Sequence, residues 1–175
     1  PILTLAEITM RGHVGRALDL GTGCGVQSYH LSRHADRVVA NDLNPRALRL
    51  ARLGAALSGM DVDFREGSLY EPVAGERFDL IVSNPPYVMS PPGGQRLTYR
   101  ESTFTADGLV EAVVRDAPAH LTPGGSLQLL TNWAATQEPW EERLASWVEG
   151  SGCDLFAIER ERLDRFAYIE MWLTD

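Results

Sequence analysis

The sequence predicts an α/β fold built on a mostly parallel sheet of seven strands, with helices on both faces and one antiparallel strand. From residue 15 onward, short runs of apolar and β-branched residues alternate with helical patterns, as in strands that are joined by crossover helices. The first strand runs into a glycine-rich turn. The last two strands are separated by "RERLDRF", which is too short for a helical crossover, so they are predicted to pair antiparallel.

The elements follow from local patterns in chain order. Strands are predicted at residues 16–20, 37–41, 62–65, 78–83, 126–131, 154–159 and 167–173, and helices at 3–11, 25–33, 45–57, 107–120 and 138–149. The helix at 45–57 has the clearest start, because Asn44 is a good N-cap and Pro45 stands at the first helical position, where its missing N–H costs nothing.

Composition indicates a soluble, cytoplasmic protein that forms one domain over residues 1–175. Hydrophobic residues make up 44% of the chain, but no apolar run approaches the ~20 residues of a membrane span. The N-terminus lacks the charged start and long apolar core of a signal peptide. Because the chain starts at Pro1 rather than at methionine, we expect that an N-terminal segment is missing from it.

The ionisable residues argue against two classes of function. Cys24 and Cys153 are too few and too far apart for a cysteine metal cluster, and the four histidines lack ligand spacing, so no metal site is predicted. The net charge of −8 disfavours broad binding to a polyphosphate backbone. Arg46, Arg49 and Arg52 recur every three residues; we interpret them as a solvated helix face rather than a phosphate-binding stripe.

The loop after the first strand has the character of a ligand site. In "LDLGTGCG", Gly21, Gly23 and Gly25 let a ligand approach the backbone, since glycine has no Cβ and adopts positive φ. The dinucleotide fingerprint GxGxxG is not met, because residue 26 is valine. Asp42 follows the second strand, where a carboxylate can accept both hydroxyls of a ribose. Together the two features predict a nucleoside site without a pyrophosphate; the alternative is a tight turn and a helix-entry residue.

The fourth predicted strand runs into "SNPPY", which a sheet interior does not tolerate. Asn84 offers a side-chain carbonyl, and Pro85 offers a backbone carbonyl on a rigid ring without an N–H. Two such acceptors can hold the N–H groups of a planar nitrogen, whose lone pair is otherwise delocalised, and stabilise the positive charge that develops on it. Tyr87 can stack on the flat face of the substrate group. The alternative is a plain strand terminator.

These motifs resemble those of class I S-adenosylmethionine-dependent methyltransferases, a group with a Rossmann-like fold. The resemblance rests on "LDLGTGCG", "NDLNP" and "SNPPY" and covers nearly the whole chain from residue 15. It implies S-adenosylmethionine as the cofactor. The implied cofactor-binding residues are Asp19, Gly21, Thr22, Gly23, Gly25, Asp42, Leu43, Ser68, Leu69 and Asn84, and the implied catalytic and substrate-binding residues are Asn84, Pro85, Pro86 and Tyr87.

Within this set the implied roles differ. Asp19 would lie near the amino end of the cofactor, Asp42 would hold the ribose hydroxyls, and Leu43 would pack against the adenine. Ser68 stands where the class often has an acid that receives the adenine amino group. A hydroxyl can accept the same hydrogen bond, but without charge assistance the bond is weaker.

The resemblance is strongest to the HemK/PrmC type of release-factor glutamine methyltransferases. Asp107-Gly108-Leu109 and Pro123-Gly124-Gly125 match that type. It implies a methyl transfer to a glutamine side-chain amide of a release factor, and the acidic net charge mildly favours a protein substrate. Adenine N6, or another exocyclic base amine, in RNA or DNA is the alternative acceptor. A non-catalytic module that binds S-adenosylmethionine is the alternative from another class.

Residues 90–105 are interpreted as a mobile lid or a simple exposed loop.

Overall fold

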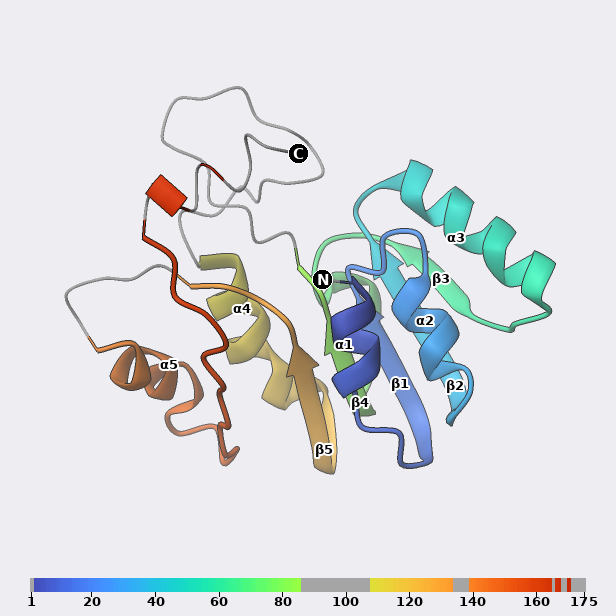
Figure 1. Ribbon diagram of the computed structural model, residues 1–175. Coiled ribbons are helices and arrows are strands. Elements are labelled where there is room, and N and C mark those ends of the chain that lie inside the picture. The colour runs from blue at the N-terminus through green and yellow to red at the C-terminus, as the bar shows by residue number, and fades with distance from the viewer. Residues whose placement is uncertain (1, 86–107, 134–138, 165, 168–169, 171–175) are drawn as a thin grey trace.

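The computed structural model describes residues 2–85, 108–133, 139–164, 166, 167 and 170. Its sheet is parallel throughout these residues, with the strand order β3-β2-β1-β4-β5. The strands are β1 (Val14–Leu20), β2 (Ala35–Asp42), β3 (Asp63–Glu66), β4 (Phe78–Ser83) and β5 (Leu121–Leu129). Because all five run the same way, their carboxyl ends meet at one edge of the sheet, which lies toward the top in Figure 1.

Helices connect the strands as the sequence pattern predicts. They are α1 (Ile2–Ile8), α2 (Val26–Leu31), α3 (Pro45–Ser58), α4 (Gly108–Asp116) and α5 (Trp140–Val148), with short 3₁₀ turns η1 (Glu71–Val73) and η2 (Ala117–His120). All five predicted helices are confirmed, and the bounds of α3 differ by one residue. The Asn44 side chain caps α3 as expected, because its oxygen accepts hydrogen bonds from the N–H groups of Arg46 and Ala47.

The two faces of the sheet bury separate clusters. Successive side chains of a strand point to opposite faces, so Ala17 packs with Leu5 of α1 and Leu31 of α2, whereas Leu18 packs with Val113 of α4. Figure 1 accordingly shows α1 and α2 on one side of the sheet and α4 on the other. The fold class is therefore confirmed: a parallel α/β sheet covered by helices on both faces.

The start of β5 corrects one local interpretation. The sequence predicts a strand that starts at residue 126, but β5 already begins at Leu121 and includes Pro123, Gly124 and Gly125. The pairing with β4 shifts between Phe78 and Leu80, as at a β-bulge. A Cβ at Gly125 would lie 2.9 Å from the Phe78 carbonyl oxygen. Glycine is needed here because the neighbouring backbone is so close.

The C-terminal strands differ from the prediction. Residues 154–159 are described and belong to no strand, and the side chain of Phe156 is 87% exposed. A strand is stabilised by its ladder partners, and the predicted partner at 167–173 lies mostly outside the described residues. The described sheet thus has five of the seven predicted strands. Ala167 and Glu170, which fall in the last predicted strand, are helical, so the predicted antiparallel pair is not formed among the described residues.

Candidate active site

Three loops meet at the carboxyl edge of the sheet. β1 runs into the glycine loop, β2 ends at Asp42, and β4 runs into Asn84. Ser83 lies beside Leu20 in the β1–β4 ladder, and its hydroxyl donates a hydrogen bond of 2.8 Å to the Leu20 carbonyl. Asn84 therefore follows β4 at the level where the glycine loop leaves β1.

The glycine loop and Asp42 are in direct contact. The N–H of Gly23 donates to Asp42 Oδ2 at 2.8 Å, and Asp42 Oδ1 accepts the N–H of Asn44 at the same distance. Each carboxylate oxygen has a second lone pair, so both remain able to accept a hydroxyl. Gly21 and Gly23 have positive φ, and a Cβ at either position would have no atom of the described residues within 4 Å. The space above these two glycines is thus open for a ligand.

Asp19 is buried under this loop with its charge only partly compensated. The side chain is 1% exposed. Its Oδ2 accepts hydrogen bonds from the Thr22 hydroxyl at 2.6 Å, the Ser28 hydroxyl at 2.6 Å and the Ser28 N–H at 2.8 Å. Burial raises the pKa of Asp19 to about 6 despite these bonds, and the negative charge of Asp42 adds to the rise.

Two buried carbonyl oxygens and one carboxylate oxygen lack partners at this edge. Asp19 Oδ1, Asn41 Oδ1 and Asn84 Oδ1 have no hydrogen-bond donor among the described residues. Buried polar atoms are normally paired, so each unpaired atom calls for an explanation. All three are acceptors. They fit a ligand that brings N–H or O–H donors, such as the ammonium group of an amino acid, a base amine or a carboxamide.

Asn41 is a residue that the sequence reasoning did not single out. It was read as the last residue of a strand, but its side chain is 1% exposed, and its Nδ2 donates to the Leu69 carbonyl at 2.8 Å. Its backbone carbonyl accepts the N–H groups of Gly21 and Thr22. Asn41 therefore joins the glycine loop to the loop that carries Ser68 and Leu69. An amide at the end of an apolar strand was the only signal in the sequence.

Some of the remaining predicted site residues are described in the structure, and others lie outside the described residues. Leu43 is 70% exposed beside Asp42, so an apolar surface is available there, and Ser68 is partly exposed in the loop after β3. Pro85 is buried directly after Asn84. Pro86, Tyr87, Asp107 and the proposed lid at residues 90–105 lie outside the described residues. The stacking role of Tyr87 therefore stays a prediction.

Tyr29 connects the glycine loop to α3. Its hydroxyl lies 2.8 Å from the Ala51 carbonyl of α3 and 3.1 Å from the Cys24 carbonyl of the loop. A Cβ at Gly25 would lie 2.7 Å from the same hydroxyl, and a Cβ at Gly54 would also collide with it. These glycines make room for the ring. Tyr29 thus holds the loop against α3, the helix that begins three residues after Asp42.

We expect Tyr29→Phe to weaken binding of S-adenosylhomocysteine severalfold and to lower the free energy of unfolding by about 1 kcal/mol, the usual loss for one hydrogen bond. Calorimetric titration and urea unfolding measure the two effects. Ser32→Ala is the matched control, because Ser32 is the C-cap of α2 and its hydroxyl bonds to the Ser28 carbonyl within the same helix, not to the glycine loop or α3. The control should lose stability while it keeps its affinity; equal affinities for all three proteins would contradict the role of Tyr29.

Fold and site together define the class of protein. A parallel sheet in the order β3-β2-β1-β4-β5, with a glycine loop after β1, a carboxylate after β2 and Asn-Pro after β4, has the arrangement of a class I methyltransferase. The chain belongs to the family described as Methyltransferase small domain, which matches residues 3–149.

Similarity to individual proteins agrees with this family. The chain is 43% identical over 159 residues to the release factor glutamine methyltransferase of Deinococcus radiodurans, covering 83% of this chain and 56% of that protein. It is 37% identical over 169 residues to the ribosomal protein uL3 glutamine methyltransferase of Bradyrhizobium diazoefficiens, covering 86% and 52%. The chain thus spans about half the length of these curated relatives.

A solved structure has the same fold. A 16S rRNA N2 methyltransferase from T. thermophilus, in complex with AdoMet and guanosine, superposes with a TM-score of 0.53 at 27% identity. The match covers 67% of this chain and 29% of that one.

Proposed function

We propose that this chain transfers a methyl group from S-adenosylmethionine to a planar nitrogen, and that the acceptor is the side-chain amide of a glutamine in a release factor. The observation that carries the proposal is Asn84 Oδ1 at the carboxyl edge of the sheet, which is buried, has no partner among the described residues and lies next to the open glycine loop. The glutamine methyltransferases of D. radiodurans and B. diazoefficiens support the choice of acceptor.

The residues fit the cofactor by their chemistry. Asp19 Oδ1 would accept a hydrogen bond from the ammonium group, and Asp42 would accept the ribose hydroxyls. Leu43 would cover the adenine, and Ser68 would receive its amino group. The cofactor would supply an electrophilic methyl group on its sulfonium.

The chain's own contribution to the reaction is orientation. Asn84 Oδ1 would accept one N–H of the substrate amide, and the Pro85 carbonyl would accept the other. Because both acceptors follow a strand of the sheet and precede proline residues, their directions are restricted. They would turn the nitrogen lone pair toward the methyl group and stabilise the positive charge that grows on nitrogen.

Methylation of a base amine is the second candidate. It is favoured by the similarity to the 16S rRNA N2 methyltransferase, which was solved with guanosine. An exocyclic base amine is a planar nitrogen with two N–H groups, so the same two acceptors would serve it. The net charge of −8 argues against it, since an RNA backbone would be repelled.

Transfer of label distinguishes the two acceptors. The chain is incubated with methyl-labelled cofactor and either a release factor that contains the GGQ motif or total RNA. We expect label in the release factor, none when its GGQ glutamine is replaced by alanine, and none with the Asn84→Ala enzyme. Label in RNA alone would refute the glutamine proposal and support the base amine.

A further inference from the structure

A basic cavity lies between α1 and α2, away from the carboxyl edge of the sheet. Its volume is about 150 Å³, which is large enough for a small ligand. Its lining residues are Ala6, Thr9, Arg11, Gln27, His30, Leu31, Arg33 and His34. The backbone carbonyl of His34 accepts the N–H of Val14, the first residue of β1. The cavity therefore opens near the amino end of β1, and the proposed active site lies beyond its carboxyl end.

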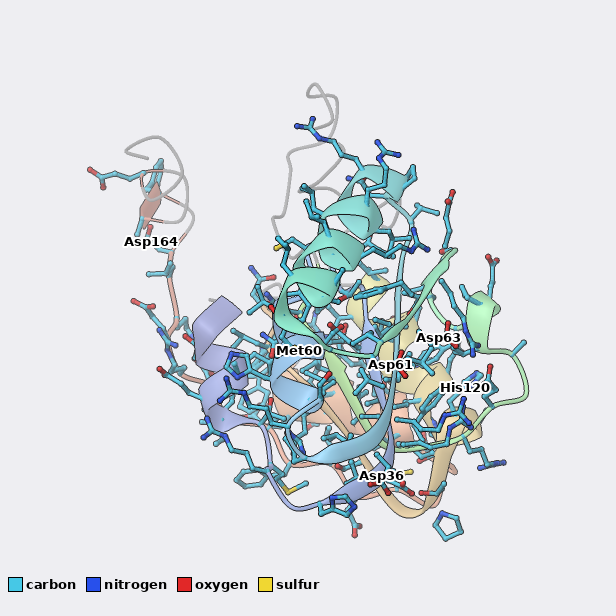
Figure 2. All side chains as sticks on the ribbon, turned by 90° about the vertical axis from the view of Figure 1, so that its right-hand side faces the viewer. Asp36, Met60, Asp61, Asp63, His120 and Asp164 are labelled. Atoms are coloured by element: carbon cyan, nitrogen blue, oxygen red, sulfur yellow. The ribbon has the colours of Figure 1, made fainter. Side chains whose placement is uncertain are left out.

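Among the described residues that line the cavity, two carry positive charge and none is a carboxylate. Arg11 and Arg33 are charged at any physiological pH, and an imidazole ring offers an N–H donor in either protonation state. The nearby acids are not in the lining: Glu7 lies on α1, and Asp36 pairs with His13 at 3.1 Å. Figure 2 shows Asp36 at the bottom of the molecule, at the amino edge of the sheet.

Most of the basic side chains of the cavity have no partner among the described residues, whereas the Thr9 hydroxyl donates a hydrogen bond to the Leu5 carbonyl. The side chains of His30, Arg33 and His34 have no hydrogen bond or ion pair within the described residues, and His34 Nδ1 is buried without a partner. Arg11 has one weak bond, 3.3 Å to the Ala6 carbonyl.

The end of α2 does not explain these basic groups. Basic residues are common at helix C-termini because they bond to the last carbonyl groups. Here backbone N–H groups already occupy those carbonyls, since Ser32, Arg33 and His34 donate to Ser28, His30 and Leu31. The basic side chains thus point to a ligand that accepts several hydrogen bonds and carries negative charge.

We propose that this cavity binds a phosphate group, as inorganic phosphate or as the phosphate of a small phosphomonoester. A tetrahedral oxyanion offers acceptors in several directions, which matches two guanidinium groups and two imidazoles, and charge-assisted bonds of this kind are strong. A recess of this volume suits one compact anion better than a nucleic-acid backbone, which binds along a surface groove.

Titration calorimetry with inorganic phosphate, and separately with glycerol 3-phosphate, tests the proposal at constant ionic strength. We expect saturable binding of at least one of them by the 175-residue chain. Arg33→Gln and His34→Gln should each weaken it about tenfold. Arg37→Gln is the matched control, because Arg37 is also exposed and lies outside the lining. Thermal melts establish that each variant is folded.

The ranking of the two probes identifies the source of the phosphate. Tighter binding of inorganic phosphate indicates the free ion, and tighter binding of glycerol 3-phosphate indicates a phosphomonoester. Excess S-adenosylhomocysteine should not displace either probe, because the proposed cofactor site is at the other end of β1. Absence of saturable binding, or equal losses in Arg33→Gln and Arg37→Gln, would overturn the proposal. So would binding of single-stranded RNA that depends on Arg33 while neither small phosphate binds.

Discussion

Replacing Asn84 by alanine is expected to lower kcat by about two to three orders of magnitude, the usual effect of removing one group that stabilises charge in a transition state. The side-chain carbonyl is buried and has no hydrogen-bond partner among the described residues, so the variant loses no hydrogen bond of that atom to this part of the chain. Affinity for S-adenosylhomocysteine should stay within a fewfold of the wild-type value. Single-turnover methyl transfer to a release factor measures the rate, and calorimetry measures the affinity.

Asp42→Ala is the matched comparison for Asn84→Ala. Asp42 holds the Gly23 N–H and is proposed to accept the ribose hydroxyls. Its removal should weaken cofactor binding by about tenfold or more, at 1.5–3 kcal/mol for a hydrogen bond to a charged group. The rate at saturating cofactor should change less than in Asn84→Ala. Unchanged cofactor affinity in Asp42→Ala would refute the ribose assignment, and an affinity loss in Asn84→Ala that equals its loss in rate would refute the catalytic one.

Asp19→Asn is expected to raise stability at neutral pH and to weaken cofactor binding. Because the pKa of Asp19 is raised to about 6, the folded state binds a proton more tightly than the unfolded chain does. The free energy of unfolding therefore falls as pH rises from about 4 to about 6, and the full penalty, roughly 3 kcal/mol, is present above that range. Asparagine carries no charge, so the stability advantage of the variant over wild type should grow across the same range in urea unfolding.

The cofactor effect of Asp19→Asn has the opposite sign. An ammonium group beside Asp19 favours the ionised carboxylate, so wild-type affinity for S-adenosylhomocysteine should increase as pH rises through about 6. The variant should bind about tenfold more weakly at neutral pH and lose this pH dependence. Methylthioadenosine, which has no amino-acid part, is the control ligand. If its affinity falls as much as that of S-adenosylhomocysteine, Asp19 does not act on the ammonium group.

Local sequence signals predicted most of the fold because they act within single elements. Asn44 and Pro45 start α3 through their effect on the immediately following residues, which the sequence alone shows. The glycine loop, Asp42 and Asn84 were predicted as a site because the carboxyl ends of parallel strands meet at one edge. The bulge at Gly125 was missed because it depends on the closeness of the Phe78 carbonyl on another strand.

The sequence by itself determined the class of this protein. The glycine loop after β1, the acid after β2 and Asn-Pro after β4 can be recognised in the chain without any knowledge of packing. Only the tertiary structure decided how these parts depend on one another. Asn41 joins two site loops, and Tyr29 holds the glycine loop against α3. The basic cavity between α1 and α2 likewise gathers Arg11 with His30 and Arg33. Contacts of this kind link residues from separate elements, and their chemistry depends on burial and distance, which a linear pattern does not contain.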